Sequence, residues 1–447
     1  MINKYWVELI LVSLWITAIL NIQANVSFGH DALTYVGSGQ CFLRRAFSCT
    51  VLQEPVYPML LALLMAFGGN MASVVPVAQN VLFLLAVMFY VSSCFCNGRL
   101  AKVIVVRTAL FITLIPTFLV VVNGAIYTES ISASFTLIQL SLVVRFVRYF
   151  VLGNKASGSA GIKAWGEPLI ISVLAGGSSL IKGSFVYVQV MFGLCLLLAI
   201  LVWKTRGVGH VRIIPSIWIT TCIIASPLIY SHGWSLTRPL ELADDLFGRG
   251  GAILLGRTEY AKEFSFRTDS LPFLINALSE TTCRKIFGTQ CASYNWYSEF
   301  HNFGEDRQAF SGLTQSEMFS VGKLNLVQRP FLQMGFAFFE WSRFILHHTT
   351  TGFARLNLPL IGPLLTSFGF VLLLKIANIT VYAGLFWLIP WRSLHAKPEL
   401  VIPLLFFVAY LLPYGFVSTV VRMIYPVAPL LVLILADLGL QKWHHIA

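Results

Sequence analysis

Long runs of apolar residues recur along almost the whole chain, and they constrain the fold more than any other feature. Hydrophobic residues make up 57% of the 447 residues, and charged residues only 11%. A soluble domain could not hide so much apolar surface, so the composition indicates a polytopic membrane protein. Backbone polar groups inside a bilayer need partners within the protein, so we expect an all-α bundle.

The lengths of the apolar runs predict how often the chain crosses the membrane. A helix needs about 20 apolar residues to span ~30 Å of hydrocarbon, and this length predicts about ten transmembrane helices. We expect them over residues 5–24, 72–93, 102–122, 126–146, 166–181, 184–203, 213–231, 369–390, 400–418 and 424–440.

Two further apolar segments are typical of helices that lie along a membrane surface. Met59–Phe67 is too short to span and ends at a Gly-Gly-Asn sequence, so we expect an interfacial helix in the first outer loop. Phe331–His347 has helical periodicity, with Glu340 and Arg343 expected on a polar side. It lies in a long outer segment that precedes the last three predicted spans.

The positions of the basic residues predict the topology. Lysines and arginines gather in alternate connections and in the C-terminal tail, which predicts that both termini are cytoplasmic. The first loop and the long segment before the last three spans are then expected outside, and we expect a bacterial inner membrane with these parts in the periplasm. We divide the chain into an N-terminal transmembrane module (1–230, with the first outer loop at 25–71), an extracytoplasmic segment (231–357) and C-terminal transmembrane helices (358–447). The net charge of +12 is explained by these loops, so no nucleic-acid partner is expected.

The cysteines agree with this topology. Two pairs have the same spacing, Cys41 with Cys49 and Cys283 with Cys291, and both pairs lie in polar loops predicted to be outside. An oxidising compartment favours disulfides there, so we expect each pair to close a small loop. The other four cysteines lie in or beside apolar runs and are expected to be free thiols.

One polar stretch, 29–58, lies between the first apolar run and the others. It contains Asp31, Tyr35 and Glu54, and it ends in a Pro-Val-Tyr-Pro sequence that includes Tyr57. We interpret this stretch as a catalytic loop. The alternative for Asp31 is a solvated loop carboxylate or a helix N-cap.

Three other charged residues are predicted at the outer ends of spans. Glu129 begins the fourth span, and its alternative is a helix-start carboxylate favoured by the macrodipole. Lys182 lies in the turn after the fifth span, where the alternative is snorkelling towards the interface. Arg422 precedes the last span on the outer side, where a positive charge is unusual and indicates an anionic ligand.

Two acids and two cations at one mouth of a bundle favour sugar transfer from a lipid phosphate. A carboxylate can take the proton of an attacking hydroxyl, and cations can neutralise charge on the departing phosphate. The donor would be lipid-borne, since free nucleotide sugars are not expected outside the membrane.

These motifs resemble a known family. The chain combines an early loop Asp, Glu-Pro-Val-Tyr-Pro (54–58), Thr-Glu (128–129), Lys-Gly (182–183) and Arg422 with Tyr-Pro-Val-Ala-Pro (425–429). This order is similar to the polyprenyl-phosphate-sugar-dependent glycosyltransferases of the C-type fold, which include protein O-mannosyltransferases and aminoarabinose transferases. The resemblance covers most spans but little of the long outer segment.

The resemblance implies specific roles for these residues. It implies that Asp31 is the catalytic base, and that Lys182 and Arg422 bind the donor phosphate. We add Glu129 as a second catalytic acid and Tyr425 beside the phosphate. Tyr35, Glu54 and Tyr57 are assigned to substrate binding. Several family members carry an acidic pair in the first loop, whereas His30 and Ala32 flank Asp31 here. We therefore assign no metal ligand, and dependence on a divalent cation stays open.

Several functional alternatives remain at this point. A transporter or flippase of a lipid-linked or anionic solute would require charges at mid-membrane depth and repeated halves with broken helices, and no repeat is visible. An oligosaccharide ligase or polymerase would share the chemistry and differ in substrate size. The sugar, the lipid, glycan or protein acceptor and the anomeric outcome stay open. The glycine-rich segment 248–260 is interpreted as a flexible outer loop, with Arg249 or Arg257 contacting the acceptor.

Overall fold

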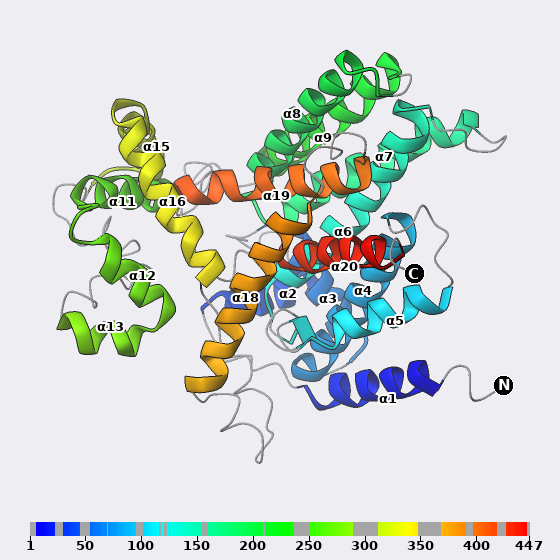
Figure 1. Ribbon diagram of the computed structural model, residues 1–447, viewed down its shortest axis with the longest axis horizontal. Helices are drawn as coiled ribbons and strands as arrows, with labels where there is room; N and C mark the ends of the chain where they lie inside the picture. Colours follow the sequence, from blue (N-terminus) through cyan, green and yellow to red (C-terminus); the bar gives the residue numbers. More distant parts are fainter. Residues whose placement is uncertain are drawn as a thin grey trace.

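The protein is helical wherever the structure describes regular elements. The computed structural model describes residues 6–22, 30–44, 54–68, 70–94, 102–115, 118–119, 123–124, 126–153, 160–208, 211–236, 250–288, 312–346, 368–389, 397–417 and 426–444. Within these ranges the helices gather into one large bundle and a smaller group at its side (Figure 1). The prediction of an all-α protein is confirmed.

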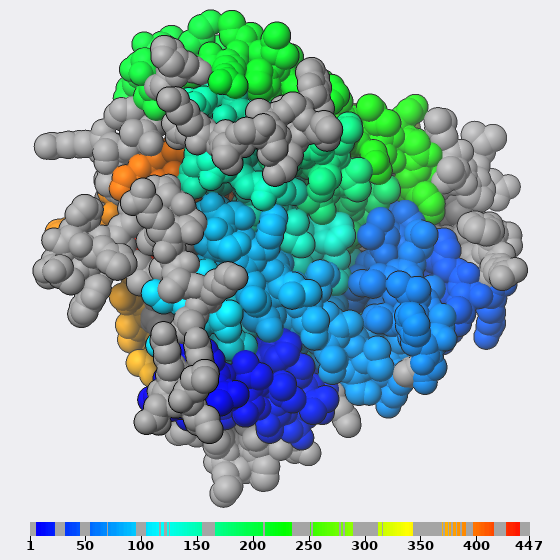
Figure 2. Space-filling view, turned by 90° about the vertical axis from the view of Figure 1, so that its right-hand side faces the viewer, coloured from blue at the N-terminus to red at the C-terminus, as the bar shows by residue number. Residues whose placement is uncertain are grey.

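The N-terminal half supplies most of the bundle. Its helices are α1 (Trp6–Asn21), α2 (His30–Leu43), α3 (Val56–Ala66), α4 (Met71–Cys94), α5 (Lys102–Thr113), α6 (Thr128–Phe146) with a π-helical continuation (Val147–Val151), α7 (Ala160–Ile181), α8 (Phe185–Thr205) and α9 (Ile213–Leu236). Figure 2 shows the first helices in blue on the lower and right-hand part of one face, with green α8 and α9 at its top.

The C-terminal half contains the outer helices and the last helices of the bundle. They are α11 (Gly250–Glu263), α12 (Ser270–Leu278), α13 (Glu280–Phe287), α15 (Gln315–Gln328), α16 (Pro330–Leu346), α18 (Phe368–Leu388), α19 (Pro398–Val417) and α20 (Ala428–His444). Gly250–Glu263 is a regular helix, so the prediction of a flexible loop there is wrong. Four apolar residues, from Ala252 to Leu255, follow the glycines and continue into α11.

Four helices in the described part of the chain are long and apolar enough to cross a bilayer: Met71–Cys94, Thr128–Val151, Phe185–Thr205 and Ile213–Trp234. Length and composition together thus identify an integral membrane protein. A helix overlaps every one of the predicted spans, but ten crossings stay a prediction.

The third predicted span differs most from expectation. A continuous helix was expected over residues 102–122, but α5 ends at Thr113. Pro116 follows three residues later, and proline disfavours helical conformation in the residue before it and cannot donate its own backbone hydrogen bond. The apolar run therefore overstates the length of this helix.

Helix α6 lies at the centre of the bundle. It contacts α4, α7 and α19, and 83% of its apolar window is buried. Small hydroxyl residues permit this close packing, and two of them donate to backbone carbonyls of their own helix. Ser134 donates to the Ser130 carbonyl (3.1 Å), and Ser141 donates to the Leu137 carbonyl (2.6 Å).

Polar and aromatic contacts fix the registers of the helices around α6. Gln139 on α6 and Gln189 on α8 exchange two amide hydrogen bonds, each 2.8 Å long. Nearly one helical turn after Gln189, Phe192 on α8 meets Phe406 on α19 edge to face, with ring centres 5.0 Å apart. A reciprocal amide pair satisfies both side chains without a charge, which suits a buried position in a bilayer.

The helices of the first outer loop pack against each other. The Tyr35 ring of α2 meets the Tyr57 ring of α3 edge to face at 5.0 Å. Helix α3 ends at Ala66, and Gly68 follows with a φ of 73°, a conformation that glycine adopts without steric cost. The prediction of helices in this loop is confirmed, whereas their position on the membrane surface stays a prediction.

The outer helices α11, α12, α13, α15 and α16 form the smaller group (Figure 1). An apolar cluster made by Ala261, Phe264, Phe273 and Phe336 holds α11, α12 and α16 together. Thr314 and Glu317 form a reciprocal capping box at the start of α15. The group contacts the bundle through α16, which packs on α18 and α19, and through α11, which packs on α19.

Candidate functional site

The turn between α7 and α8 carries the first charged contact of the candidate site. Lys182 directly follows the last residue of α7, and its ammonium lies 3.2 Å from the Glu129 Oε1 atom. Only 15% of the Lys182 side chain and 6% of the Glu129 side chain are exposed. Lys182 thus turns towards the bundle instead of snorkelling away from it.

Glu129 owes its place to the start of α6. Tyr127 is extended, and α6 begins at Thr128, so Glu129 lies in the first turn. The Thr128 hydroxyl donates to the second Glu129 carboxylate oxygen at 3.4 Å. The partial positive charge of the helix N-terminus and the Lys182 ammonium both attract a carboxylate to this position. The sequence predicted this residue correctly at a bundle-facing helix start, but it did not predict the partner.

A second carboxylate reaches the same turn from the first loop. Glu54 lies just before α3, and its Oε1 atom accepts a 2.8 Å hydrogen bond from the Gly183 backbone N–H. Consecutive residues, Lys182 and Gly183, therefore contact two acids that are 75 residues apart in the sequence. The central feature of the candidate site is the Glu129–Lys182 ion pair, with a second carboxylate, Glu54, bound to the next backbone N–H.

The Glu54 contact depends on the lack of a side chain at Gly183. A Cβ atom there would collide with the Glu54 carboxylate oxygen. We expect Gly183→Ala to break this charge-assisted hydrogen bond and to lower the free energy of unfolding by about 1.5–3 kcal/mol. Thermal unfolding in detergent measures the loss. Gly166→Ala is the control, because a Cβ at Gly166 meets nothing within 4 Å. Equal stability of the two variants would contradict the role of this contact.

A network of polar side chains within the bundle lies next to the site. Tyr57 donates to the Gln79 side-chain carbonyl (3.0 Å), and Gln79 donates to the Asn123 backbone carbonyl (2.8 Å). The Ser130 hydroxyl donates to the Asn123 side-chain oxygen at 2.6 Å. The Asn123 side-chain amide in turn donates to the Asn80 side-chain oxygen at 3.2 Å. This network joins α3 and α4 to the start of α6.

Sequence reasoning missed this network. The signal was present, because Gln79 and Asn80 are adjacent amides inside a predicted span, where polar side chains are costly and need partners. Burial raises the pKa of Tyr57 well above its ordinary value, and the nearby Tyr35 and Glu129 raise it further. Tyr57 is therefore a neutral hydrogen-bond donor.

Helix α19 contributes a residue that the sequence did not single out. The Tyr414 hydroxyl lies 2.6 Å from the Ser184 hydroxyl, and its ring centre lies 5.9 Å from the Lys182 ammonium. This geometry is that of a cation–π contact. Tyr414 also packs on Tyr410 one turn earlier, with ring centres 4.7 Å apart.

The other predicted site residues are placed less completely. Asp31 lies in the first turn of α2, one helical turn before Tyr35. Tyr35 contacts Tyr57, so α2 adjoins the supporting network. Arg422 and Tyr425 fall between α19 and α20, outside the described residues. The structure thus brings together Glu129, Lys182 and Glu54, with Tyr57 and Tyr35 beside them.

The structure describes only one cysteine of each predicted disulfide pair. Cys41 and Cys283 are described, and neither is a free thiol. Cys49 and Cys291 lie outside the described residues, so both pairings stay predictions. Cys94, Cys195 and Cys222 are free, as expected.

No group of three or more His, Cys, Asp or Glu side chains that could hold a metal ion occurs in the described part of the chain. Comparison with protein-family models, with curated proteins and with solved structures finds no match for this chain. The chemistry of the site therefore rests on its own residues.

Proposed function

We propose that the protein is an integral membrane glycosyltransferase that moves a sugar from a polyprenyl-phosphate donor to a lipid, glycan or protein acceptor. One observation carries the proposal: the buried Glu129–Lys182 ion pair, with Glu54 bonded to the next backbone N–H. A buried cation paired with one acid, with a second acid bound to the adjacent residue, suits a reaction that removes a proton and releases a phosphate.

The proposed reaction assigns the charges as follows. An acceptor hydroxyl attacks the anomeric carbon of the donor sugar, and its proton passes to the Asp31 carboxylate. The bond between the anomeric carbon and the phosphate oxygen breaks, and polyprenyl phosphate leaves with the electron pair. Lys182, assisted by Arg422 and Tyr425, neutralises the charge on that phosphate. Glu129 holds Lys182 in position and is the second catalytic acid.

The aromatic and polar residues around this centre bind the substrates in the proposal. Tyr35 and Tyr57 form one wall, since their rings touch and Tyr57 is fixed by Gln79. Glu54 accepts from Gly183, and a carboxylate beside a backbone turn suits recognition of sugar hydroxyls. The distribution of basic residues supports cytoplasmic termini and a site on the opposite face, which we propose is the periplasmic face of a bacterial inner membrane.

Transport of a lipid-linked or anionic solute is the alternative. It would favour charged groups midway along the spans, as in transporters with sites near the midplane. Midway along the α6 segment lies Gln139, whose contact is the neutral pair with Gln189 of α8. The ion pair Arg148–Glu399 (3.2 Å) joins the π-helical end of the α6 segment to the start of α19. Charge at the two ends of one segment favours the transferase.

A direct assay tests the proposal. Membranes containing the protein are incubated with polyprenyl-phosphate hexose or pentose donors, and released polyprenyl phosphate is measured by mass spectrometry. We expect release that depends on the protein and on an acceptor fraction. Movement of intact donor across vesicles, without release, would support the flippase alternative. Donors that carry one sugar or a chain of sugars separate a transferase from an oligosaccharide ligase.

The donor-binding residues are tested by charge removal. Lys182→Ala and Arg422→Ala are each expected to weaken donor binding by about 10–100-fold, the loss of one charge-assisted hydrogen bond. Acceptor affinity should change much less, and titration of each substrate against the purified variants measures both. Lys204→Ala is the control, since Lys204 lies in the last turn of α8, at the opposite end from the site. Equal loss for donor and acceptor would indicate a structural role.

A further inference from the structure

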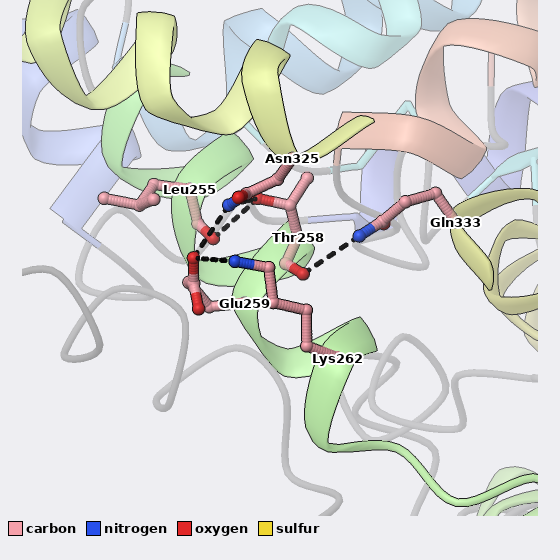
Figure 3. A network of polar contacts seen from close by, with 6 residues as sticks. All are labelled: Leu255, Thr258, Glu259, Lys262, Asn325 and Gln333. Atoms are coloured by element: carbon pink, nitrogen blue, oxygen red, sulfur yellow. Dashed lines mark hydrogen bonds and ion pairs between the residues drawn. The ribbon is translucent and has the colours of Figure 1, made fainter. Parts of the chain in front are cut away.

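The outer helices contain a buried polar network. Figure 3 shows residues of α11, α15 and α16 turned towards one another. Asn325 of α15 donates to the Thr258 hydroxyl (3.1 Å) and to the Glu259 carboxylate (2.7 Å). Lys262 pairs with the same carboxylate at 2.7 Å, and Gln333 of α16 donates to the Thr258 carbonyl at 3.0 Å. The polar side of α16 thus faces inwards.

Arg257 lies at the centre of this interior. Its guanidinium is fully buried, donates to the Gln333 backbone carbonyl at 3.0 Å, and lies 5.0 Å above the Phe336 ring. Burial lowers the pKa of Arg257 to about 10 and Glu340 opposes the shift, so Arg257 stays cationic at neutral pH. The prediction that Arg257 contacts an acceptor is wrong for this structure, because no part of its side chain reaches the surface.

The opposite side of α16 is exposed and apolar. Phe331 is 87% exposed, Met334 56% and Phe338 70%, whereas Gln333 and Glu340 are each 1% exposed. The sequence predicted that Glu340 lies on the polar side of a membrane-surface helix, and the structure shows that this side chain is buried. Glu340 turns inwards because Arg257, 83 residues earlier, supplies an opposite charge there.

The exposed side continues onto α15. Leu324 and Val327 are also exposed, and these two with Phe331, Met334 and Phe338 follow one another at intervals of three and four residues. We call these five residues the apolar stripe. A helix beside water buries its apolar side and exposes its polar side. The exposed side of α16 is instead apolar, whereas Gln333 and Glu340 are buried together with Phe336 and Ala337, an arrangement that suits a helix beside lipid.

Neighbouring elements indicate what covers the apolar stripe. Helix α16 packs on α18 and α19, and the Trp341 indole N–H donates to the Leu411 carbonyl of α19 at 2.9 Å. Helix α18 itself exposes Leu372, Leu373 and Ile376, so apolar surface continues from the bundle onto the outer helices. Lys323 and Arg329 are exposed beside the stripe, where they can meet anionic headgroups.

We propose that the apolar stripe is a membrane-docking surface, seated among the headgroups and first acyl carbons of a bilayer that contains anionic lipid. The outer helices then lie down on the membrane beside the bundle instead of standing in water. The buried network of Arg257, Gln333 and Glu340 lets α16 keep its polar groups away from the lipid. This proposal does not depend on the proposed function.

Site-directed spin labels test the docking surface. Phe331→Cys, Met334→Cys and Phe338→Cys are labelled in the full-length protein in vesicles of phosphatidylethanolamine and phosphatidylglycerol. Gln328→Cys is the control, because Gln328 is exposed and lies beside the stripe. The unmutated protein, treated with the same label, gives the background from its own thiols. These side chains are exposed, so the substitutions leave the packed interior unchanged.

We expect the three stripe labels to be accessible to dissolved oxygen and protected from a water-soluble nickel chelate, and the Gln328 label to show the reverse. Nickel accessibility equal to that of Gln328 at all three stripe positions would overturn the proposal. Protection from both reagents, with spin–spin broadening between labels, would show that a second copy of the chain covers the stripe, and it would overturn lipid docking too.

Discussion

Replacing Asp31 by asparagine is expected to lower the rate of sugar transfer by roughly 10²–10⁴-fold, the contribution of a positioned general base. Asparagine matches aspartate in shape but cannot take a proton from the acceptor hydroxyl. Donor binding should persist, because the cations assigned to the phosphate are unchanged. Release of polyprenyl phosphate and equilibrium binding of the donor, measured on the same preparation, separate the two effects.

The control for this variant is Glu263→Gln, which removes an exposed carboxylate at the end of α11. It should transfer sugar at the rate of the unmutated protein. A pH–rate profile adds a second readout, since loss of the base should remove its limb from the profile. If Asp31→Asn turns over normally, Asp31 is not the base. Loss of the same limb in Glu129→Gln instead would move the assignment to Glu129.

Separating the buried ion pair is expected to destabilise the fold strongly. Glu129→Gln or Lys182→Met should each cost about 3–5 kcal/mol, because each leaves an uncompensated charge where the partner was removed. The double variant should cost less than the sum of the two, since no isolated charge remains. Intrinsic fluorescence follows unfolding in detergent of the unmutated protein, the two single variants and the double variant. The four free energies of unfolding form a double-mutant cycle.

A more exposed pair provides the matched comparison. Lys262 and Glu259 are 2.7 Å apart on α11, with side chains 27% and 19% exposed. Lys262→Met should change stability by no more than about 1 kcal/mol, because solvent screens such pairs. Equal costs for Lys182→Met and Lys262→Met would show that the Glu129–Lys182 pair is not desolvated. The site would then lose the feature on which the proposed function depends.

The sequence predicted most helices because hydrophobic periodicity and length are local signals. It placed Glu129 at a helix start and Lys182 in a turn, both correctly. It missed Tyr414, whose relation to Ser184 spans 230 residues, and it missed the bond from Gln79 to Asn123. Contacts of that kind depend on how helices pack, and no local pattern encodes them.

The burial of Glu340 on α16 was not predicted, for a related reason. A helical pattern shows that Glu340 and Phe338 lie on different sides, but it does not show which side meets solvent. The sequence predicted a helix on the membrane with Glu340 on its polar side, whereas the structure buries Glu340 near Arg257 of α11. Sequence reasoning on a membrane protein needs the identity of the surrounding solvent before an amphipathic pattern can be oriented.

The central position of α6 has a consequence for how the chain enters the membrane. It is the least apolar of the four candidate spans, and two of its partners, Lys182 and Gln189, are synthesised 53 and 50 residues after Glu129 and Gln139. Before those partners have been synthesised, α6 carries a carboxylate and an amide that lack them. We therefore expect the stable insertion of α6 to depend on the arrival of α7 and α8.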